Sequence, residues 1–151
     1  MNFAIRQLKT EDLQDGSGFL ETLSHLSDIS NLAIKARQEI FERASGNGIY
    51  FLVAVSEEEE NKGQIVSTVK LIVEPKFFHG GLSAGHIEDV VTRQGFEGQG
   101  LSKALLTEAI KIARDSGCYK VILDCKKEFI PFYSKLGLTE HDICMRLDLI
   151  D

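Results

Sequence analysis

Hydrophobic and polar residues alternate, or hydrophobic residues run together, in several short stretches that predict β-strands. These stretches are residues 3–8, 49–55, 64–73, 86–92, 120–125 and 143–149. Apolar positions with helical spacing predict helices over 10–26, 32–44 and 104–113, and a short one from Pro131 to just before Gly137. The chain has 151 residues and no linker-like segment, so we expect a single α/β domain over 1–151.

A glycine-rich loop follows the predicted strand 86–92, with glycines at 95, 98 and 100 directly before a helix. Glycines let a backbone approach a phosphate closely, and a helix start offers unpaired N–H groups and a positive dipole end. The sequence therefore predicts a phosphate-binding loop, although a plain glycine-rich turn is the structural alternative. The candidate donors are Gly98, Gln99, Gly100, Leu101 and Ser102.

This loop differs from two common nucleotide-binding motifs. The dinucleotide fingerprint has the order G-x-G-x-x-G and lies in the first βα unit. A Walker loop needs Lys and then Ser or Thr after its last glycine, whereas Leu101 follows Gly100 here.

Charge and composition exclude some classes of function. The net charge of −6 argues against nucleic-acid binding, and no apolar run reaches the ~18 residues of a membrane span. Cys118, Cys125 and Cys144 are odd in number and lack zinc-site spacing, and no signal peptide is visible. We expect reduced thiols, a cytoplasmic protein and no metal.

Four sequence blocks, GHIEDV, GQGLSKALL, GCYKVILDC and FYSKLGL, occur in this order. In them the chain resembles the GCN5-related N-acetyltransferase (GNAT) superfamily and, within it, the eukaryotic glucosamine-6-phosphate N-acetyltransferases. The resemblance implies an α+β GNAT fold: a mixed, mostly antiparallel sheet with splayed strands and flanking helices. It also implies acetyl transfer from acetyl-coenzyme A to the 2-amine of D-glucosamine 6-phosphate, in UDP-N-acetylglucosamine biosynthesis.

The same resemblance implies which residues bind acetyl-coenzyme A. The cofactor would fill a gap beside the strand 86–92 and pair with the backbone of Val90, Val91 and Thr92. The loop residues named above, together with Lys103, would hold its pyrophosphate. Tyr133 would lie near the sulfur and protonate the departing thiolate.

Glu88 and Asp89 are adjacent in a predicted strand, so regular alternation would point them to opposite faces. A β-bulge would turn one of them, and the resemblance implies such a bulge. It also implies that Glu88, Asp89 and Asp124 meet the sugar amine, which makes them catalytic candidates with Tyr133. The alternatives are an exposed or capped carboxylate pair and, for Asp124, a structural ion pair.

Further residues are substrate-binding candidates by resemblance, in addition to the three carboxylates. They are Ser27, Lys76, His79, Tyr119, Lys120 and Arg146. The terminal stretch 143–149 is apolar at alternate residues and needs a sheet partner. The resemblance implies that two subunits exchange this strand in a homodimer with shared active sites, so that Arg146 reaches the partner's substrate.

Two other functions use the same features. A related acetyltransferase could act on a different amine, such as a protein N-terminus or a polyamine. A non-catalytic acyl-coenzyme A-binding or interaction module would keep the glycine loop but would have no use for Glu88, Asp124 and Tyr133 together.

Overall fold

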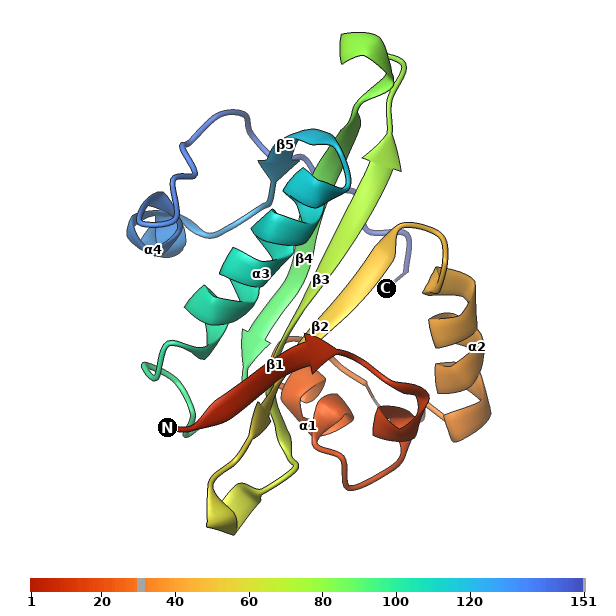
Figure 1. Ribbon diagram of the computed structural model, residues 1–151, viewed down its shortest axis with the longest axis vertical. Helices are drawn as coiled ribbons and strands as arrows, with labels where there is room; N and C mark the ends of the chain where they lie inside the picture. The colour runs from red at the N-terminus through yellow and green to blue at the C-terminus, as the bar shows by residue number, and fades with distance from the viewer. Residues whose placement is uncertain (30–31, 151) are drawn as a thin grey trace.

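The computed structural model describes residues 1–29 and 32–150, and within them five strands form one sheet (Figure 1). The strands are β1 (Phe3–Gln7), β2 (Ile49–Ser56), β3 (Ile65–Pro75), β4 (Ser83–Thr92) and β5 (Cys118–Ile122). They lie in chain order; β1 to β4 are antiparallel, and β5 is parallel to β4. The predicted mixed, mostly antiparallel sheet is confirmed.

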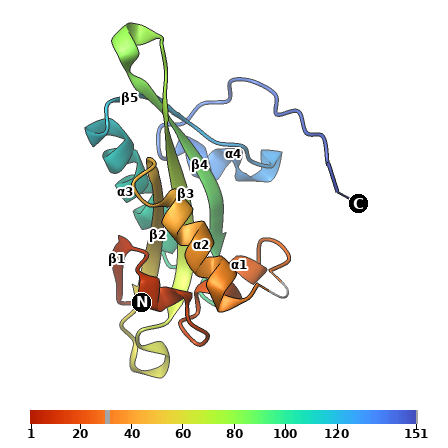
Figure 2. The same ribbon diagram turned by 90° about the vertical axis from the view of Figure 1, so that its right-hand side faces the viewer.

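Helices cover both faces of this sheet (Figures 1 and 2). They are α1 (Phe19–Ser24), α2 (Ile34–Ala44), α3 (Leu101–Asp115) and α4 (Ile130–Ser134). The spacing of Leu105, Ala109 and Ala113 puts them on one side of α3, where they are fully buried against the sheet. On the other face, Phe19 of α1 packs in a second cluster with Val53 and Ile65. No helix among the described residues combines the length and apolarity needed to cross a membrane.

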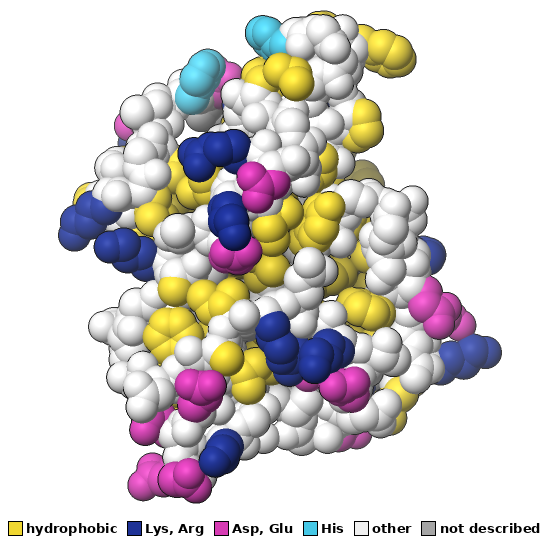
Figure 3. Space-filling model, viewed as in Figure 1, with side chains coloured by type: hydrophobic (Ala, Val, Ile, Leu, Met, Phe, Trp, Pro, Cys, Tyr) yellow, Lys and Arg dark blue, Asp and Glu magenta, His cyan; other side chains and the backbone are white. Residues whose placement is uncertain are grey.

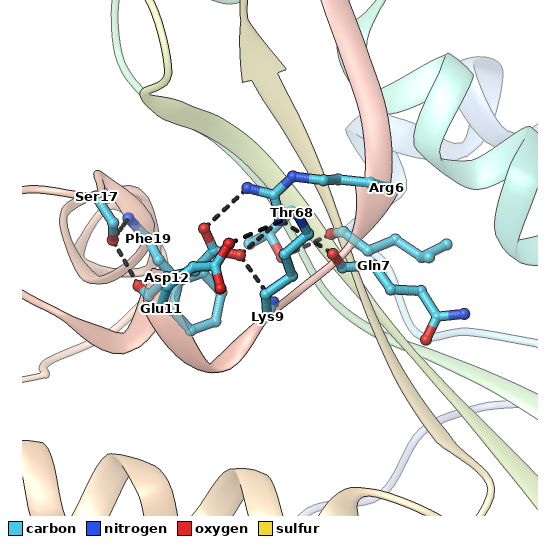
Figure 4. Close-up of polar contacts among 9 residues, drawn as sticks. Arg6, Gln7, Lys9, Glu11, Asp12, Ser17, Phe19 and Thr68 are labelled. Atoms are coloured by element: carbon cyan, nitrogen blue, oxygen red, sulfur yellow. Dashed lines mark hydrogen bonds and ion pairs between the residues drawn. The ribbon is translucent and has the colours of Figure 1, made fainter.

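An ion pair joins β1 to the 3₁₀ turn η1 (Thr10–Leu13) (Figure 4). The Arg6 guanidinium donates to both carboxylate oxygens of Asp12, at 2.6 and 2.8 Å, and the Lys9 N–H donates to Oδ2 at 2.8 Å. Burial opposes ionisation of Asp12, but these hydrogen bonds dominate and lower its carboxyl pKa. The contact holds the edge strand against the turn that leads to α1.

The predicted helix over 10–26 is wrong in its middle. The structure has η1 and then α1, separated by Gly16 and Gly18, both with φ of +85°. A left-handed residue cannot continue an α-helix, so the chain turns here. A Cβ at Gly18 would lie 2.3 Å from the guanidinium of Arg93, so this glycine also makes room for that side chain.

Two predicted strands also differ from the structure. The strand expected over 120–125 ends at Ile122, so Asp124 lies beyond it. The prediction of a strand over 143–149 is wrong for this chain by itself. The segment has no strand hydrogen bonding and runs away from the sheet (Figure 2). A strand forms only where a neighbouring strand supplies backbone partners, and this segment has none among the described residues of its own chain.

Candidate active site

A β-bulge in β4 turns the two adjacent carboxylates to the same face of the sheet. In the β3–β4 pairing Lys70 lies opposite Glu88 and Thr68 opposite Val91, so one extra residue of β4 is accommodated between them. The extra residue lies where Asp89 adopts a left-handed φ of +53°. The predicted bulge is confirmed.

Packing shows the effect of this bulge on side-chain direction. Ile87 and Val90 both pack against the core cluster under α3, which regular alternation would not allow for residues three apart. Lys70, opposite Glu88, places its ammonium 2.6 Å from Asp89 Oδ2. Glu88 and Asp89 therefore lie together on the face opposite α3.

Beyond the first part of β4, the edge toward β5 is unpaired. The β4–β5 ladder runs from Ser83 to His86 and stops where β5 ends at Ile122. In the part of the chain that the structure describes, no strand takes up this edge from Ile87 to Thr92. The free edge expected beside β4 is present after His86, and the pairing of Val90, Val91 and Thr92 with acetyl-coenzyme A stays a prediction.

The glycine loop joins this edge to the start of α3. Gly95, Gly98 and Gly100 have φ values of +89°, +73° and +84°, and a Cβ at any of them would meet no atom within 4 Å. Backbone conformation, rather than lack of space, requires glycine here. Gly100 caps α3, so the N–H groups of the following residues have no acceptor within the helix. Leu101, Ser102 and Lys103 thus occupy the first turn, in an arrangement that suits an anion.

Hydroxyl groups connect the end of β4 to that first turn. The Ser67 hydroxyl donates to the carbonyl of Val91 at 2.9 Å, so it accepts from Thr92 at 2.8 Å. The Thr92 hydroxyl then accepts from Ser102, also at 2.8 Å. This chain holds the loop against β3 and leaves the backbone N–H of Ser102 for a ligand.

Tyr133 lies on α4 with Pro131 in the first turn. Its half-buried ring contacts Phe132 edge-on, with centroids 5.0 Å apart, and packs against the core under α3. Burial raises the pKa of the phenol, and the nearby Cys125 adds to this effect. The hydroxyl is therefore protonated at neutral pH and can donate a proton or a hydrogen bond.

The C-terminal segment lies near two of the carboxylates. The Cys144 thiol donates to Asp124 Oδ2, with the two atoms 3.4 Å apart. This hydrogen bond and the charge of Asp124 raise the pKa of Cys144, and the charge of Glu88 adds a smaller increase. The contact between Cys144 and Asp124 therefore joins the C-terminal segment to the residues just after β5.

The predicted phosphate-binding residues fall into two small groups near the β3–β4 hairpin. The Glu74 carboxylate accepts a hydrogen bond from Lys76 at 2.5 Å and lies 2.6 Å from Nε2 of His86. Both contacts lower the pKa of the Glu74 carboxyl, and the contact with Lys76 has the larger effect. The ring of His79 lies 4.2 Å from that of Tyr119, whose face is 5.4 Å from the Lys120 ammonium.

Two other predicted substrate residues are not in these groups. Ser27 is exposed just after α1, and Arg146 pairs with Asp148 of its own segment at 2.5 Å.

Sequence reasoning missed Lys70 and the buried position of Arg93. Lys70 was detectable as a charged residue inside an apolar strand. Arg93 is only 8% exposed, donates to the carbonyl of Ile65 and to Glu21, and lies over the ring of Phe96. Nothing in its local sequence distinguishes it from an exposed loop arginine.

A groove of about 650 Å³ lies on the β1 side of α3, away from α4 and β5. Its lining is Ile5, Arg6, Gln7, Leu52, Gly100, Lys103, Ala104, Thr107, Glu108 and Ile112. Figure 3 shows hydrophobic side chains reaching the surface between charged ones on this face. The groove shares only Gly100 and Lys103 with the predicted cofactor residues, so we place the reaction at the free edge of β4 instead.

A bulged strand with a free edge, followed by a glycine loop at a helix start, defines an acyltransferase-type site. The chain matches the acetyltransferase (GNAT) family model over residues 17–138. It is 40% identical over 149 residues to the glucosamine 6-phosphate N-acetyltransferase of Trypanosoma brucei brucei, covering 99% of this chain and 97% of that protein. The chain therefore belongs to the acetyltransferase (GNAT) family.

Solved structures agree with this assignment. The crystal structure of glucosamine-6-phosphate N-acetyltransferase from Arabidopsis thaliana matches with a TM-score of 0.90 at 34% identity, covering 99% of this chain and 100% of that one. An acetyltransferase from Trypanosoma brucei matches with a TM-score of 0.89 at 40% identity, covering 98% and 100%.

Proposed function

We propose that this protein is a glucosamine 6-phosphate N-acetyltransferase, which moves the acetyl group of acetyl-coenzyme A to the 2-amine of D-glucosamine 6-phosphate. The products are N-acetyl-D-glucosamine 6-phosphate and coenzyme A. The observation that carries the proposal is the β4 bulge, which puts Glu88 and Asp89 together beside an unpaired strand edge that leads to a glycine loop. The names of the trypanosome and plant relatives support the sugar phosphate as substrate.

Acetyl-coenzyme A supplies an activated thioester. The protein's own groups accept the proton of the amine and donate to the leaving sulfur. A sugar ammonium must lose a proton before it can attack. Glu88, Asp89 and Asp124 orient the amine and accept that proton directly or through water. A backbone N–H of the free β4 edge donates to the thioester carbonyl, and the protonated Tyr133 phenol donates to the leaving sulfur.

The loop from Gly98 to Lys103 binds the pyrophosphate of the cofactor in this proposal. Two features support this assignment: no atom lies within 4 Å of where a Cβ would stand at Gly98 or Gly100, and the loop leads into the positive end of α3. Lys76 and His79 contact the sugar phosphate in this proposal. Tyr119, which packs beside His79, and Lys120 reach the substrate of the partner subunit.

We also propose a homodimer in which the terminal segment pairs with the partner subunit. Four alternate residues of this segment are between 81% and 92% exposed: Ile143, Met145, Leu147 and Leu149. An apolar strand-like segment exposed to this extent is a template for pairing with another chain. Arg146, on the opposite side of the segment, would then reach the partner's sugar phosphate.

A thiol-release assay across several amines tests the function. With acetyl-coenzyme A, we expect glucosamine 6-phosphate to release coenzyme A much faster than glucosamine, glucosamine 1-phosphate, a polyamine or a peptide with a free N-terminus. Equal turnover of glucosamine with and without the 6-phosphate would remove the proposed substrate. Faster turnover of the polyamine or the peptide would support a different acetyltransferase activity.

A further inference from the structure

Lys70 is a charged residue in the most buried part of β3. Its chain neighbours Val69 and Leu71 are fully buried under α3, while its own side chain points to the other face and is 25% exposed. There it lies opposite Glu88 and places Nζ 2.6 Å from Oδ2 of Asp89. The ion pair therefore joins β3 directly to the bulge of β4.

A contact of this kind can stabilise the backbone conformation of the bulge. Asp89 has a left-handed φ of +53°, a conformation that residues other than glycine adopt reluctantly. Such strained positions persist where the surrounding structure holds them. Lys70 supplies an ion pair to the strained residue itself, from the neighbouring strand.

The same contact affects the reacting groups. Glu88 and Asp124 carry negative charge near Cys144, and Asp89 adds a third carboxylate on the same face as Glu88. Lys70 compensates the charge of one of these three and fixes where the Asp89 carboxylate lies. Val90 follows the bulge directly, so the direction of the β4 backbone at the free edge also depends on the conformation of Asp89.

We propose that Lys70 is a positioning residue of the acetyl-transfer site, which holds Asp89 and the β4 bulge in the geometry that transfer requires. The inference rests on the proposed function of this site as an acetyltransferase, but not on the identity of the amine. It predicts that Lys70 acts through Asp89, so that its removal affects the chemical step more than acetyl-coenzyme A binding.

The test is a double-mutant cycle with Lys70→Met, Asp89→Asn and the double variant. Lys70→Arg keeps the positive charge and a side chain of similar length. Lys62→Met is the control, because it removes a lysine from an exposed ion pair with Glu59 in the β2–β3 connection, away from the bulge. For each variant we measure kcat, the KM for acetyl-coenzyme A and the melting temperature, with an amine that the wild-type enzyme accepts.

We expect Lys70→Met to lower kcat by about tenfold, with KM for acetyl-coenzyme A nearly unchanged, and the double variant to be no slower than Asp89→Asn. Lys70→Arg should recover most of the activity, and Lys62→Met should match wild type. Multiplicative losses in the double variant, or an unchanged kcat in Lys70→Met, would overturn the proposal. So would a loss in Lys70→Arg as large as in Lys70→Met. If Lys70→Met does not fold, Lys70→Arg is compared with wild type instead, and a tenfold or larger loss of kcat in Lys70→Arg would overturn the proposal.

The proposed function and the role of Lys70 can be tested independently of each other. If the wild-type enzyme is inactive with glucosamine 6-phosphate but active with another amine, the substrate assignment is wrong. The double-mutant cycle of Lys70 and Asp89 can then still be measured with that amine. A wild-type enzyme with no acetyltransferase activity would overturn both.

Discussion

The thiol of Cys144 donates a hydrogen bond to the carboxylate of Asp124, with Sγ 3.4 Å from Oδ2. The contact links the C-terminal segment to the residues just after β5. It raises the pKa of the thiol, because a thiolate would lie beside the charges of Asp124 and Glu88. The segment, which has no strand partner among the described residues of its own chain, thus contacts one of the predicted site residues.

The first prediction concerns the assembly. Sedimentation should show a dimer at micromolar concentration, because Leu147 and Leu149 expose apolar surface that a partner sheet would cover. Replacing both with Glu should shift the protein toward monomer and lower activity. The control is a double Glu substitution at Lys111 and Arg114, on the exposed side of α3. A monomeric and fully active wild-type enzyme would remove the shared-site proposal.

Complementation tests the role of Arg146 in a shared site. Arg146→Ala and Asp124→Ala should each be weakly active, and refolding the two together should restore part of the activity. The reason is that one of the two sites in a mixed dimer keeps both residues. A mixed dimer that stays as inactive as its parents would leave the interface in place but exclude Arg146 from the partner's pocket.

The third prediction concerns the leaving group. Tyr133→Phe removes one hydroxyl and should lower kcat by about 100-fold, with little change in acetyl-coenzyme A affinity, because a general acid acts in the chemical step. Tyr50→Phe on β2 is the matched control, since this tyrosine also packs against the core under α3. If chemistry limits the rate and Tyr133→Phe keeps its kcat, the ring has only a packing role.

The fourth prediction separates the glycine loop from backbone strain. Gly100→Val and Gly46→Val both place a branched residue at a positive φ, +84° and +75°, in positions where a Cβ meets no atom within 4 Å. Both should lose roughly 1–3 kcal/mol of stability from strain. Calorimetry should find weakened coenzyme A binding only in Gly100→Val. Equal affinity in the two variants would contradict the assignment of the loop.

The last prediction is a pH dependence of stability. The pKa of Asp12 is lowered in the folded protein, so the stability from its contact with Arg6 is present above the ordinary value of 3.8 and is lost as the pH falls toward the folded pKa. At pH 7, Asp12→Asn should reduce the free energy of unfolding by about 2–3 kcal/mol, because the Asp12 side chain is 8% exposed and Arg6 loses its partner.

That difference between Asp12→Asn and wild type should shrink below about pH 4, as the carboxyl of the wild-type protein takes up its proton. Glu39→Gln on α2 breaks an exposed pair with Lys35 and should change stability by under about 1 kcal/mol. A difference that is constant from pH 7 to pH 3 would show that the charge of Asp12 contributes nothing.

Several features of the site could be predicted from local sequence. The glycines at 95, 98 and 100 precede an amphipathic helix, and all three adopt the left-handed φ that only glycine tolerates readily. The adjacent Glu88 and Asp89 required a bulge if they were to act together, and β4 has one. The glycine conformations depend on neighbouring residues, so nearby sequence carries that information. The bulge was implied by the resemblance, and its form depends on the pairing of β4 with β3.

Other features depended on residues distant in the chain. Lys70 meets Asp89 through the pairing of two strands, and Arg93 is buried because its partners Glu21 and Ile65 come from α1 and β3. The segment 143–149 has the alternation of a strand but forms none, because strand hydrogen bonds need a neighbour.

The sequence by itself determined the order of the main strands and helices, the glycine-rich loop at residues 95–100 and the residue types available for acetyl transfer, since periodicity and glycine placement act over a few residues. Only the tertiary structure decided that Glu88 and Asp89 share one face, that Lys70 holds one of them, and that the edge of β4 toward β5 is free after His86. The physical reason is that register, bulges and ion pairs between strands are properties of contacts between distant segments, and these arise only when the sheet has formed.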